Sequence, residues 1–399
     1  MTQMYIVAGA RTPFAKYVGC SKGGMLQKFS AADLGKIASA EAMKRAHIPP
    51  EEIDHVILGT VFQVEKDAVY AARNMSLELG IPEHVPALTV QRNCASGMQA
   101  IISGALEIIA GKAEVVLSVG AESMSNIPHV VRGMRKNGNF QKFEVNDFLA
   151  ESLEHEYAKT SMSETAENIA REHNISRDAM DVFAYESHKR AAESYTKGIL
   201  REEIVPVNIQ ISGEEVSFDR DDTVRENIDL GALSSLPPAF HPDGTITAGN
   251  ACGIADGAAS VIVASEEYVE KNSLSSLGKI IDWSIVGLDP AYMGLGPVPA
   301  TQKLLTRTGK NIDEIDLWEI NEAFAAQYLG VEKKLGIPRE KVNVNGGAIA
   351  IGHPLGASGV RLILTLLLEL RRRKKRFGIA SMCIGGGQGI AVLLEAISE

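Results

Sequence analysis

Two cysteines and one histidine have the chemistry and the surroundings of catalytic residues. Cys94 lies in Gln-Arg-Asn-Cys-Ala-Ser-Gly at residues 91–97, between a short apolar strand and a long apolar helix. Cys383 lies in Cys-Ile-Gly-Gly-Gly-Gln-Gly, where another strand runs into a glycine-rich turn. His353 lies in Gly-His-Pro-Leu-Gly, also just after a predicted strand. Two thiols and an imidazole at strand ends favour acyl-transfer chemistry over a disulfide.

Cys94 has a setting that suits a nucleophile. A thiol at the start of a helix lies near unpaired backbone N–H groups and the positive end of the helix dipole, and both stabilise a thiolate. The alternative is a buried structural cysteine, which is the usual role of a single free cysteine. Asn93 and the small residues after Cys94 leave room for a ligand. The segment therefore favours a reactive thiol.

The other candidates also have structural alternatives. His353 could be an ordinary core or surface histidine, but its glycine-rich loop favours a general base. The glycines after Cys383 could present N–H groups to an oxyanion, or could only permit positive φ in a tight turn. Asn321 follows a predicted strand and could be a helix N-cap. No glycine cluster continues into Gly-Lys-Ser or Gly-Lys-Thr, so none is a phosphate-binding P-loop.

The composition narrows the class of protein. The 399 residues are 45% hydrophobic and 23% charged, which is typical of a soluble globular protein with a large core. The sequence contains no run of about 20 apolar residues, the length needed to span a bilayer. Its N-terminus lacks the pattern of a signal peptide. Four scattered cysteines are too few for a disulfide framework or a CxxC metal site. We therefore expect a cytoplasmic protein without a metal.

The charge argues against nucleic acid as a partner. The formal net charge is -10, whereas phosphate binding needs a positive field. The basic run at residues 371–376 is the apparent exception. It ends a predicted apolar helix, whose last turn favours cations through the helix dipole, so we interpret it as a helix end. Neither nucleic acid nor a membrane is an expected partner.

The chain contains a long internal repeat. Three short matches, Glu-Ile-Asp, Leu-Gly-Ile-Pro and Ala-Ser-Gly, recur in the same order, beginning at Glu52 and at Glu314. In both copies the distance from that Glu to the Ala of Ala-Ser-Gly is the same. Apolar strands alternate with helices in each half, which predicts a parallel or mixed sheet covered on both faces. Ligands of such sheets gather at the carboxyl ends of the strands.

The repeat gives a division of the chain and a set of expected elements. Residues 123–242 are more polar, with loop signals such as Lys-Asn-Gly-Asn at 136–139, and we interpret them as an insertion over the strand ends. The expected parts are an N-terminal core half (1–122), an inserted loop domain (123–242), a return to the N-terminal half (243–275) and a C-terminal core half (276–399). We expect strands at 56–58, 87–90, 115–119, 317–320, 341–344 and 377–382, and helices at 98–109, 164–173, 178–196 and 360–370.

Together these residues resemble a known family. Cys94 in Asn-Cys-Ala-Ser-Gly, Asn321 in Asn-Glu-Ala-Phe-Ala, His353 in Gly-His-Pro-Leu-Gly and Cys383 in its glycine-rich turn strongly resemble the thiolases, in the family's order and over essentially the whole chain. The resemblance implies an α/β fold with two thiolase-like βαβαβαββ halves, a five-layered α-β-α-β-α core and the insertion as a loop domain. It also implies a homo-oligomer, either dimer or tetramer.

The resemblance implies a role for each candidate. Cys94 would attack a 3-ketoacyl-CoA and carry the acyl group, and His353 would activate Cys94. Cys383 would move the proton at the substrate's α-carbon. Asn321 would hold a water that stabilises the enolate oxygen together with His353. The backbone N–H groups of Cys94 and Gly385 would form another oxyanion hole.

Coenzyme A is the implied partner, as acyl-CoA thioesters and as a substrate rather than a tightly bound cofactor. The sequence is acidic, so a site for this anionic molecule must concentrate positive charge locally, and Arg225 suits the adenosine end. The positions that match the family's coenzyme A pocket are Leu153, Met162, Arg225, Phe240, Ala248, Cys252, Ala323 and Phe324.

Two departures bear on the substrate. Ser161 precedes Met162 where short-chain biosynthetic thiolases usually carry His-Met, and Cys252 stands where a serine usually contacts pantetheine. Residues 293–299 and 384–389 look more like those of degradative 3-ketoacyl-CoA thiolases, so we favour a degradative or broad-range thiolase over a strict acetoacetyl-CoA enzyme. Related condensing enzymes lack the second cysteine at Cys383, and a non-catalytic coenzyme A or lipid carrier would not need these residues. If Cys94 and Cys383 converge, oxidation could join them and stop activity.

Overall fold

Ten strands form one mixed sheet within the described residues, which are 3–17, 24–134 and 143–397 of this computed structural model. Cys20 and the loop signal at 136–139 lie outside these residues. The strand order is β14-β15-β16-β13-β1-β12-β5-β3-β4, with β2 beside β12. The strands are β1 (Met4–Arg11), β2 (Ala15–Lys16), β3 (His55–Gly59), β4 (Ala87–Val90), β5 (Val115–Glu122), β12 (Ala255–Ser265), β13 (Gly278–Gly287), β14 (Leu317–Ile320), β15 (Phe377–Ile384) and β16 (Gln388–Ala396).

The internal repeat appears as two related halves of this sheet. In one half β12, β5 and β3 follow β1, and in the other β16, β15 and β14 follow β13 in the same sequence. The β3–β5 and β14–β15 pairs are both parallel, and β1 and β13 join the halves as antiparallel neighbours. Asp54 accepts hydrogen bonds from two backbone N–H groups at the start of β5, and Asp316 does the same for β15. The repeated Glu-Ile-Asp therefore fixes where neighbouring strands begin.

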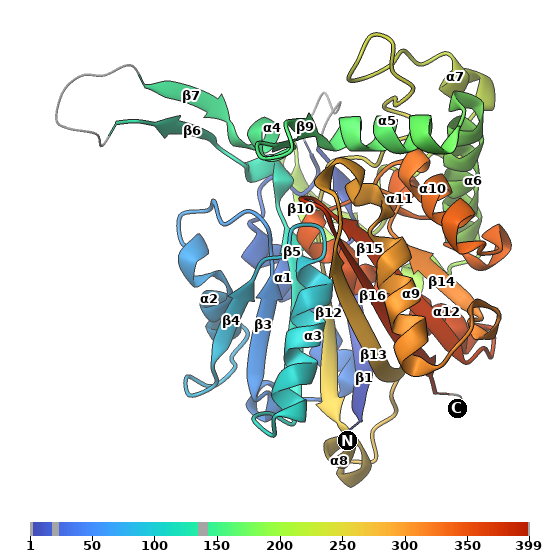
Figure 1. Cartoon of the computed structure of the whole chain (residues 1–399). Helices are drawn as coiled ribbons and strands as arrows, with labels where there is room; N and C mark the ends of the chain where they lie inside the picture. The colour runs from blue at the N-terminus through green and yellow to red at the C-terminus, as the bar shows by residue number, and fades with distance from the viewer. Residues whose placement is uncertain (1–2, 18–23, 135–142, 398–399) are drawn as a thin grey trace.

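Helices cover and separate the two halves in five layers (Figure 1). The middle layer holds α3 (Ser96–Ile109) and α12 (Leu355–Arg372), which share one apolar cluster with strands of both halves. One outer layer contains α1 (Ala31–Ala46) and α2 (Ala71–Glu78), and the other contains α9 (Pro297–Thr308) and α10 (Ala325–Leu335). Because α3 and α12 have few polar positions, their burial follows from the sequence. The expected layered α/β core is confirmed.

The two central helices cross closely near their N-terminal ends. A β-carbon at Gly97 of α3 would lie 2.3 Å from the carbonyl oxygen of Gly356, and one at Gly359 of α12 would lie 2.5 Å from the backbone nitrogen of Met98. Only glycine permits this approach, which explains the Gly of both Ala-Ser-Gly segments. The crossing brings together the loops that precede the helices. Those loops carry Cys94 and His353.

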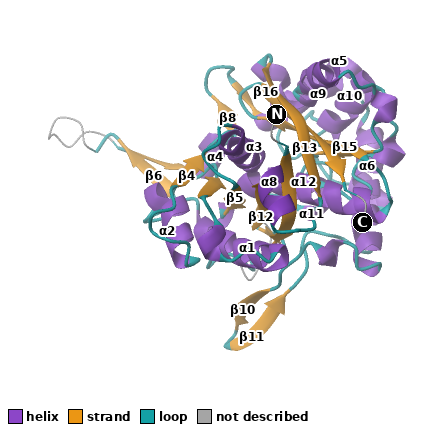
Figure 2. Ribbon diagram, turned by 90° about the horizontal axis from the view of Figure 1, so that it is seen from below, coloured by secondary structure: helices purple, strands orange, loops and turns teal. Residues whose placement is uncertain are grey.

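The described residues of the 123–242 segment contribute no strand to the ten-stranded sheet. They form hairpins and helices above the strand ends and at the side of the core, and Figure 2 shows the β10–β11 hairpin extending from the body of the molecule. The division into four parts stays a prediction. The elements here are β6 (His129–Arg132), β7 (Glu144–Asp147), α4 (Phe148–Ser152), β8 (Glu154–His155), β9 (Thr160–Ser161), α5 (Met162–His173), α6 (Arg177–Thr196), β10 (Val207–Ile211), β11 (Glu214–Phe218) and α7 (Leu230–Ser234).

A buried ionic network attaches this segment to the core. The guanidinium of Arg11, at the end of β1, donates to both carboxylate oxygens of Asp221 at 2.7 and 2.9 Å and to Glu203 at 2.6 Å. Tyr195 of α6 donates to Asp221 as well. All four side chains are buried. Removing one partner from such a network leaves an uncompensated charge, so the network fixes the segment over the sheet.

Two expectations from the sequence about residues 341–353 were wrong. Residues 341–344 are not a strand: Val342 makes a single bridge to Trp318. Asn343 has φ of 45°, outside the β region, and its side-chain amide replaces the ladder by bonding to both the N–H and the carbonyl of Ile320. His353 does not follow a strand either, because residues 348–351 form the short helix α11 (Ala348–Ile351).

The expectation about the basic run is confirmed. The basic run is a helix end: α12 stops at Arg372, and Arg372 and Arg373 both form ion pairs with Glu369. Among the described helices, none combines the length and the apolar character needed to cross a membrane.

Candidate active site

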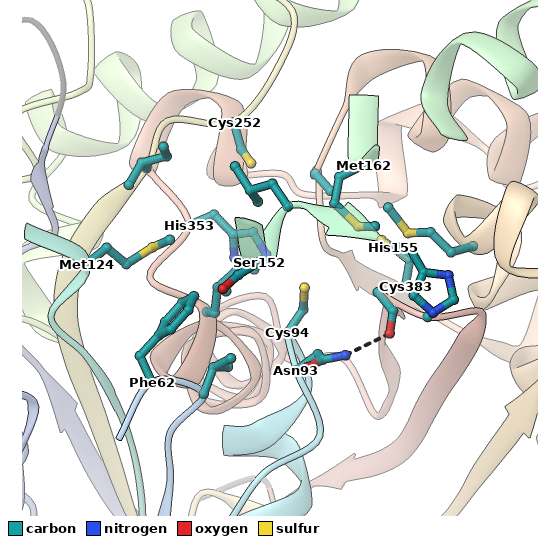
Figure 3. A pocket seen from close by; sticks show the side chains of 18 of the residues that line it. Phe62, Asn93, Cys94, Met124, Ser152, His155, Met162, Cys252, His353 and Cys383 are labelled. Carbon is teal, nitrogen blue, oxygen red and sulfur yellow. Dashed lines mark hydrogen bonds between the residues drawn. The ribbon is translucent and has the colours of Figure 1, made fainter. Parts of the chain in front are cut away.

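One cavity collects the candidate side chains from both halves of the molecule. It has a volume of about 330 Å³ and is lined by Cys94, Cys252, His353 and Cys383. Figure 3 shows these thiols and the imidazole around the same space, with Met162 on one side and Phe62 on the other. The sequence places its candidates at strand ends and in loops, and the structure brings the four of them together.

Cys94 is positioned by the turn between β4 and α3. Asn93 adopts φ of 43°, and its side-chain Nδ2 donates to the carbonyl oxygen of Gly385 at 2.8 Å, which ties this turn to the turn after Cys383. Burial raises the pKa of Cys94, while hydrogen bonds from the backbone N–H groups of Gly385 and of Cys94 itself lower it. Burial is the larger effect, so the helix start does not yield a free thiolate. Cys94 is therefore a thiol at rest, and it would need a base to act as a nucleophile.

His353 has the tautomer and charge of such a base. Ser358 has one hydroxyl hydrogen, which it donates to the carbonyl oxygen of Pro354 at 2.8 Å. It must therefore accept from Nδ1 of His353, which lies 2.6 Å away. The other ring nitrogen, Nε2, keeps its lone pair, which accepts a hydrogen bond from Nδ2 of Asn321 at 3.2 Å in the resting structure. Burial, assisted by the positive charge of Arg361, lowers the pKa of His353 to about 3, so the ring is neutral at physiological pH.

Ser358 should matter because it fixes this tautomer. We expect Ser358→Ala to lower kcat by about 10- to 100-fold, because removing one buried hydrogen-bond partner costs about 1–3 kcal/mol. The fall should appear in kcat more than in KM, as steady-state kinetics with acetoacetyl-CoA and CoA would measure. Ser284→Ala is a matched control, since Ser284 on β13 donates a buried hydrogen bond to the carbonyl oxygen of Ala300 on α9, and neither residue lines the cavity. Equal kcat in the two variants would contradict a role for Ser358.

Cys383 lines the cavity, whereas Asn321 is not among the lining residues and reaches the site through its hydrogen bond with His353. Asn321 follows β14 directly and is buried; it is not a helix N-cap, because α10 begins at Ala325 with Phe324 as its cap. Its Oδ1 is buried without a protein hydrogen-bond partner. Cys383 lies near the carboxyl end of β15, and burial together with the charges of the other two thiols raises its pKa well above the usual value. Cys383 is therefore a protonated thiol at rest.

The positions matched to a coenzyme A pocket fall into two groups. Leu153, Met162, Cys252, Ala323 and Phe324 line the cavity. Arg225, Phe240 and Ala248 do not, and Phe240 is exposed. Burial raises the pKa of Cys252 to about 12, which makes this third thiol a poor nucleophile at neutral pH.

Several lining residues were missed from the sequence. Phe62, Met124, Phe148 and His155 all line the cavity. A signal for Phe62 was available, because it precedes Phe324 by the same number of residues that separates the two Ala-Ser-Gly segments. The two phenylalanines are thus repeat-related residues that line the same cavity. Met124, Phe148 and His155 have no counterpart of this kind.

Comparisons with known proteins agree with this geometry. Residues 4–267 match the thiolase N-terminal domain family and residues 274–396 match the thiolase C-terminal domain family. The chain is 44% identical to the mitochondrial 3-ketoacyl-CoA thiolase of Homo sapiens over 98% of both chains. It is 43% identical to the acetyl-CoA acetyltransferase of Cupriavidus necator over 99% of this chain and 100% of that protein.

Solved structures give the same result. The crystal structure of human mitochondrial 3-ketoacyl-CoA thiolase in complex with CoA matches with a TM-score of 0.94 and 43% identity, covering 100% of this chain and 98% of that one. The acetyl-CoA acetyltransferase of Bacillus anthracis matches with a TM-score of 0.95 and 41% identity, covering 100% and 99%. With two family domains matched along nearly its whole length and an acyl-transfer site at their junction, the chain belongs to the thiolase family and is a CoA-dependent acyltransferase with thiolase activity.

Proposed function

We propose that this thiolase is a broad-range, degradative enzyme that cleaves 3-ketoacyl-CoA substrates longer than four carbons. The observation that carries the proposal is an apolar wall beside Cys94. Val61, Phe62, Met124, Phe148, Ile254 and Leu355 line the cavity and belong to a single apolar cluster. The rings of Phe62 and Phe148 meet edge to face at 5.8 Å. Each methylene of an acyl chain that contacts such a wall gains up to about 0.8 kcal/mol.

The chain length of the substrate and the direction of the net reaction are separate questions. An enzyme cannot favour one direction at equilibrium, so concentrations of substrate and product set the direction. A wall that binds methylenes does favour longer acyl groups over acetyl. Sequence identity does not distinguish a broad-range thiolase from a short-chain one. The mitochondrial 3-ketoacyl-CoA thiolase and the bacterial acetyl-CoA acetyltransferase are nearly equally similar to this chain.

In the first half-reaction, we assign Cys94 as the nucleophile and His353 as its base. The lone pair on Nε2 of His353 takes the thiol proton as sulfur attacks the 3-keto carbon. The bond between carbons 2 and 3 breaks and its electrons form the enolate of acetyl-CoA, which Cys383 protonates at carbon 2. Acetyl-CoA leaves, and the shortened acyl group remains on Cys94. The neutral imidazole and the protonated Cys383 thiol are the states that this step requires.

In the second half-reaction, a new CoA thiol gives its proton to the Cys383 thiolate and attacks the acyl carbon. The Cys94 thiolate leaves and regains its proton from His353, so protons balance over the cycle. The backbone N–H groups of Cys94 and Gly385 already point at the Cys94 sulfur, which suits an oxyanion hole for the acyl oxygen. Asn321, whose buried Oδ1 has no protein partner, suits a water that stabilises the enolate oxygen with His353.

We assign the pantetheine arm of CoA to the wall opposite Phe62. Leu153, Met162, Cys252, Ala323 and Phe324 line that side and offer a mainly apolar surface. Arg225, Phe240 and Ala248 would meet the adenosine end outside the cavity. CoA then acts as a substrate that enters and leaves in each cycle.

A chain-length series tests the proposal. We expect thiolysis of 3-ketoacyl-CoAs from four to sixteen carbons to show kcat/KM at least equal to the four-carbon value at eight carbons and beyond. The measurement is the loss of substrate thioester in the presence of CoA. A sharp fall beyond four carbons would instead identify a short-chain biosynthetic acetyl-CoA acetyltransferase.

We also propose that the enzyme is a homo-oligomer. The β6–β7 arm extends from the body of the molecule (Figure 1), and Met134, Phe143 and Val145 on it are exposed. Large exposed apolar side chains grouped on one arm are typical of an interaction surface. The number of subunits and the cytoplasmic location stay predictions.

A further inference from the structure

Glu122 is a buried carboxylate to which the reaction scheme gives no role. It ends β5 and has no exposed surface. No cation within the described part of the chain pairs with it. Its two oxygens accept hydrogen bonds from the Thr60 hydroxyl at 3.0 Å and from three backbone N–H groups, those of Val61 (3.0 Å), Phe62 (3.0 Å) and Gly356 (2.8 Å).

These donors come from both halves of the molecule. Residues 60–62 follow β3 in the N-terminal half and carry Val61 and Phe62 of the apolar wall. Gly356 belongs to the first turn of α12 in the other half, three residues after His353. One carboxylate therefore joins the loop that carries Phe62 to the segment that carries His353, and both border the cavity.

Burying the Glu122 carboxylate without a cation costs free energy, which indicates a role for its hydrogen bonds. A carboxylate buried without a cation loses its hydration, and burial raises the pKa of Glu122 to about 7 although its hydrogen bonds lower it. The related residue at the end of β15, in the other half, is the apolar Ile384. A strand end in this fold is thus compatible with an apolar side chain at that position. The carboxylate serves the loops it binds.

We propose that Glu122 is a positioning residue that fixes how the Phe62 loop and the His353 segment lie relative to each other beside the cavity. It acts through backbone amides and does not touch the substrate. The inference rests on the proposed roles of Cys94 and His353. Displacement of a reacting group by about 1 Å can lower the rate by about 100-fold. Loss of the Glu122 hydrogen bonds between the two loops should therefore lower kcat.

The charge of Glu122 has a second, separable effect. It raises the pKa of Cys94, in addition to the effect of burial. The titratable groups on the elements packed around Glu122 include Cys94 before α3, His353 before α12 and Asp256 on β12; His353 is neutral, and Asp256 accepts hydrogen bonds from Ser125. Removing the charge of Glu122 should therefore lower the pKa of Cys94. A variant that is only less stable would not show this change.

Glu122→Gln tests both effects. Glutamine has one acceptor oxygen, so it can keep the bonds from Thr60 and Phe62, which reach Oε1, or the bonds from Val61 and Gly356, which reach Oε2, but not all four. We expect kcat with acetoacetyl-CoA to fall by about 10- to 100-fold, with KM for CoA within about 2-fold of the wild-type value. Alkylation of Cys94 by iodoacetamide, located by peptide mass spectrometry, should reach its half-maximal rate at a lower pH than in the wild type.

Asp54→Asn is the matched control. Asp54 also bonds backbone N–H groups between β3 and β5, but at the opposite end of those strands. It should leave kcat within about 2-fold and the pH of Cys94 alkylation unchanged. An unchanged kcat in Glu122→Gln overturns the inference, and so does a fall in kcat with an unchanged alkylation pH, because both point to a structural role alone.

A shorter acid keeps the test decisive if the glutamine variant does not fold. Glu122→Asp retains the charge but cannot reach both loops, so we expect a similar fall in kcat with no shift in the alkylation pH. Wild-type kcat in this variant overturns the inference. A different experiment tests the proposed roles of Cys94 and His353: if those roles were wrong, turnover would persist in Cys94→Ala.

Discussion

Replacing Cys94 with alanine should lower turnover of 3-ketoacyl-CoA by about 10⁴- to 10⁶-fold, as loss of the nucleophile does in other covalent enzymes. The reason is that no other cavity side chain can take its place. Burial raises the pKa of Cys252 to about 12, and Cys383 is a fully buried thiol whose pKa is also raised. Neither receives the pair of backbone N–H groups that points at Cys94. Steady-state thiolysis of acetoacetyl-CoA measures the loss.

A matched control removes a different thiol from the same cavity. Cys252→Ser keeps Cys94, Asn93 and His353 in place, so it should still accept an acetyl group from acetyl-CoA. Intact-protein mass spectrometry should find this acetyl group on the wild type and on Cys252→Ser but not on Cys94→Ala. Acetylation of Cys94→Ala with turnover preserved would place the nucleophile elsewhere and refute the assignment.

The sequence is sufficient to predict the core elements because each apolar pattern, and each short motif of the repeat, spans only a few neighbouring residues. The strand at residues 317–320 and the strand at 87–90 have the predicted bounds, and α5 and α6 begin within two residues of the predicted starts. The positions of Cys94 and Cys383 at strand ends follow from the same patterns. Convergence of the two cysteines follows from the rule that ligands gather at one edge of such a sheet.

The details that the sequence does not reveal depend on contacts between distant residues. Asn343 looks like part of a strand, but its side chain bonds to the backbone of Ile320 and the chain turns instead. Cys94 looks like a stabilised thiolate from its helix, but burial from both halves outweighs the nearby N–H groups. The tautomer of His353 depends on how Ser358 uses its single hydrogen. No local pattern encodes these contacts, so the protonation states of the site require the structure.

Cys383→Ser should separate carbon–carbon bond cleavage from acyl transfer. Cys383 is the proposed proton donor at the substrate's α-carbon, and a serine hydroxyl is a much weaker acid than a thiol. We expect cleavage of acetoacetyl-CoA to fall by about 10²- to 10⁴-fold, the usual contribution of general acid–base catalysis. Exchange of the methyl protons of acetyl-CoA with deuterated solvent should be lost to a similar extent, because it requires the same proton transfer.

Transfer of an acetyl group between Cys94 and CoA breaks no C–H or C–C bond at the α-carbon. It therefore shows whether Cys383→Ser leaves the acyl-transfer step intact. We expect exchange of labelled CoA into acetyl-CoA to fall by no more than about 10-fold in Cys383→Ser. The exchange forms no enolate, so Cys383 is not turned into a thiolate, and His353 can carry the proton between Cys94 and CoA. His353→Asn is the comparison, since losing the base of Cys94 should depress both cleavage and exchange. If Cys383→Ser and His353→Asn lose the two reactions to the same extent, the two side chains act as one unit and the separate roles assigned to them are wrong.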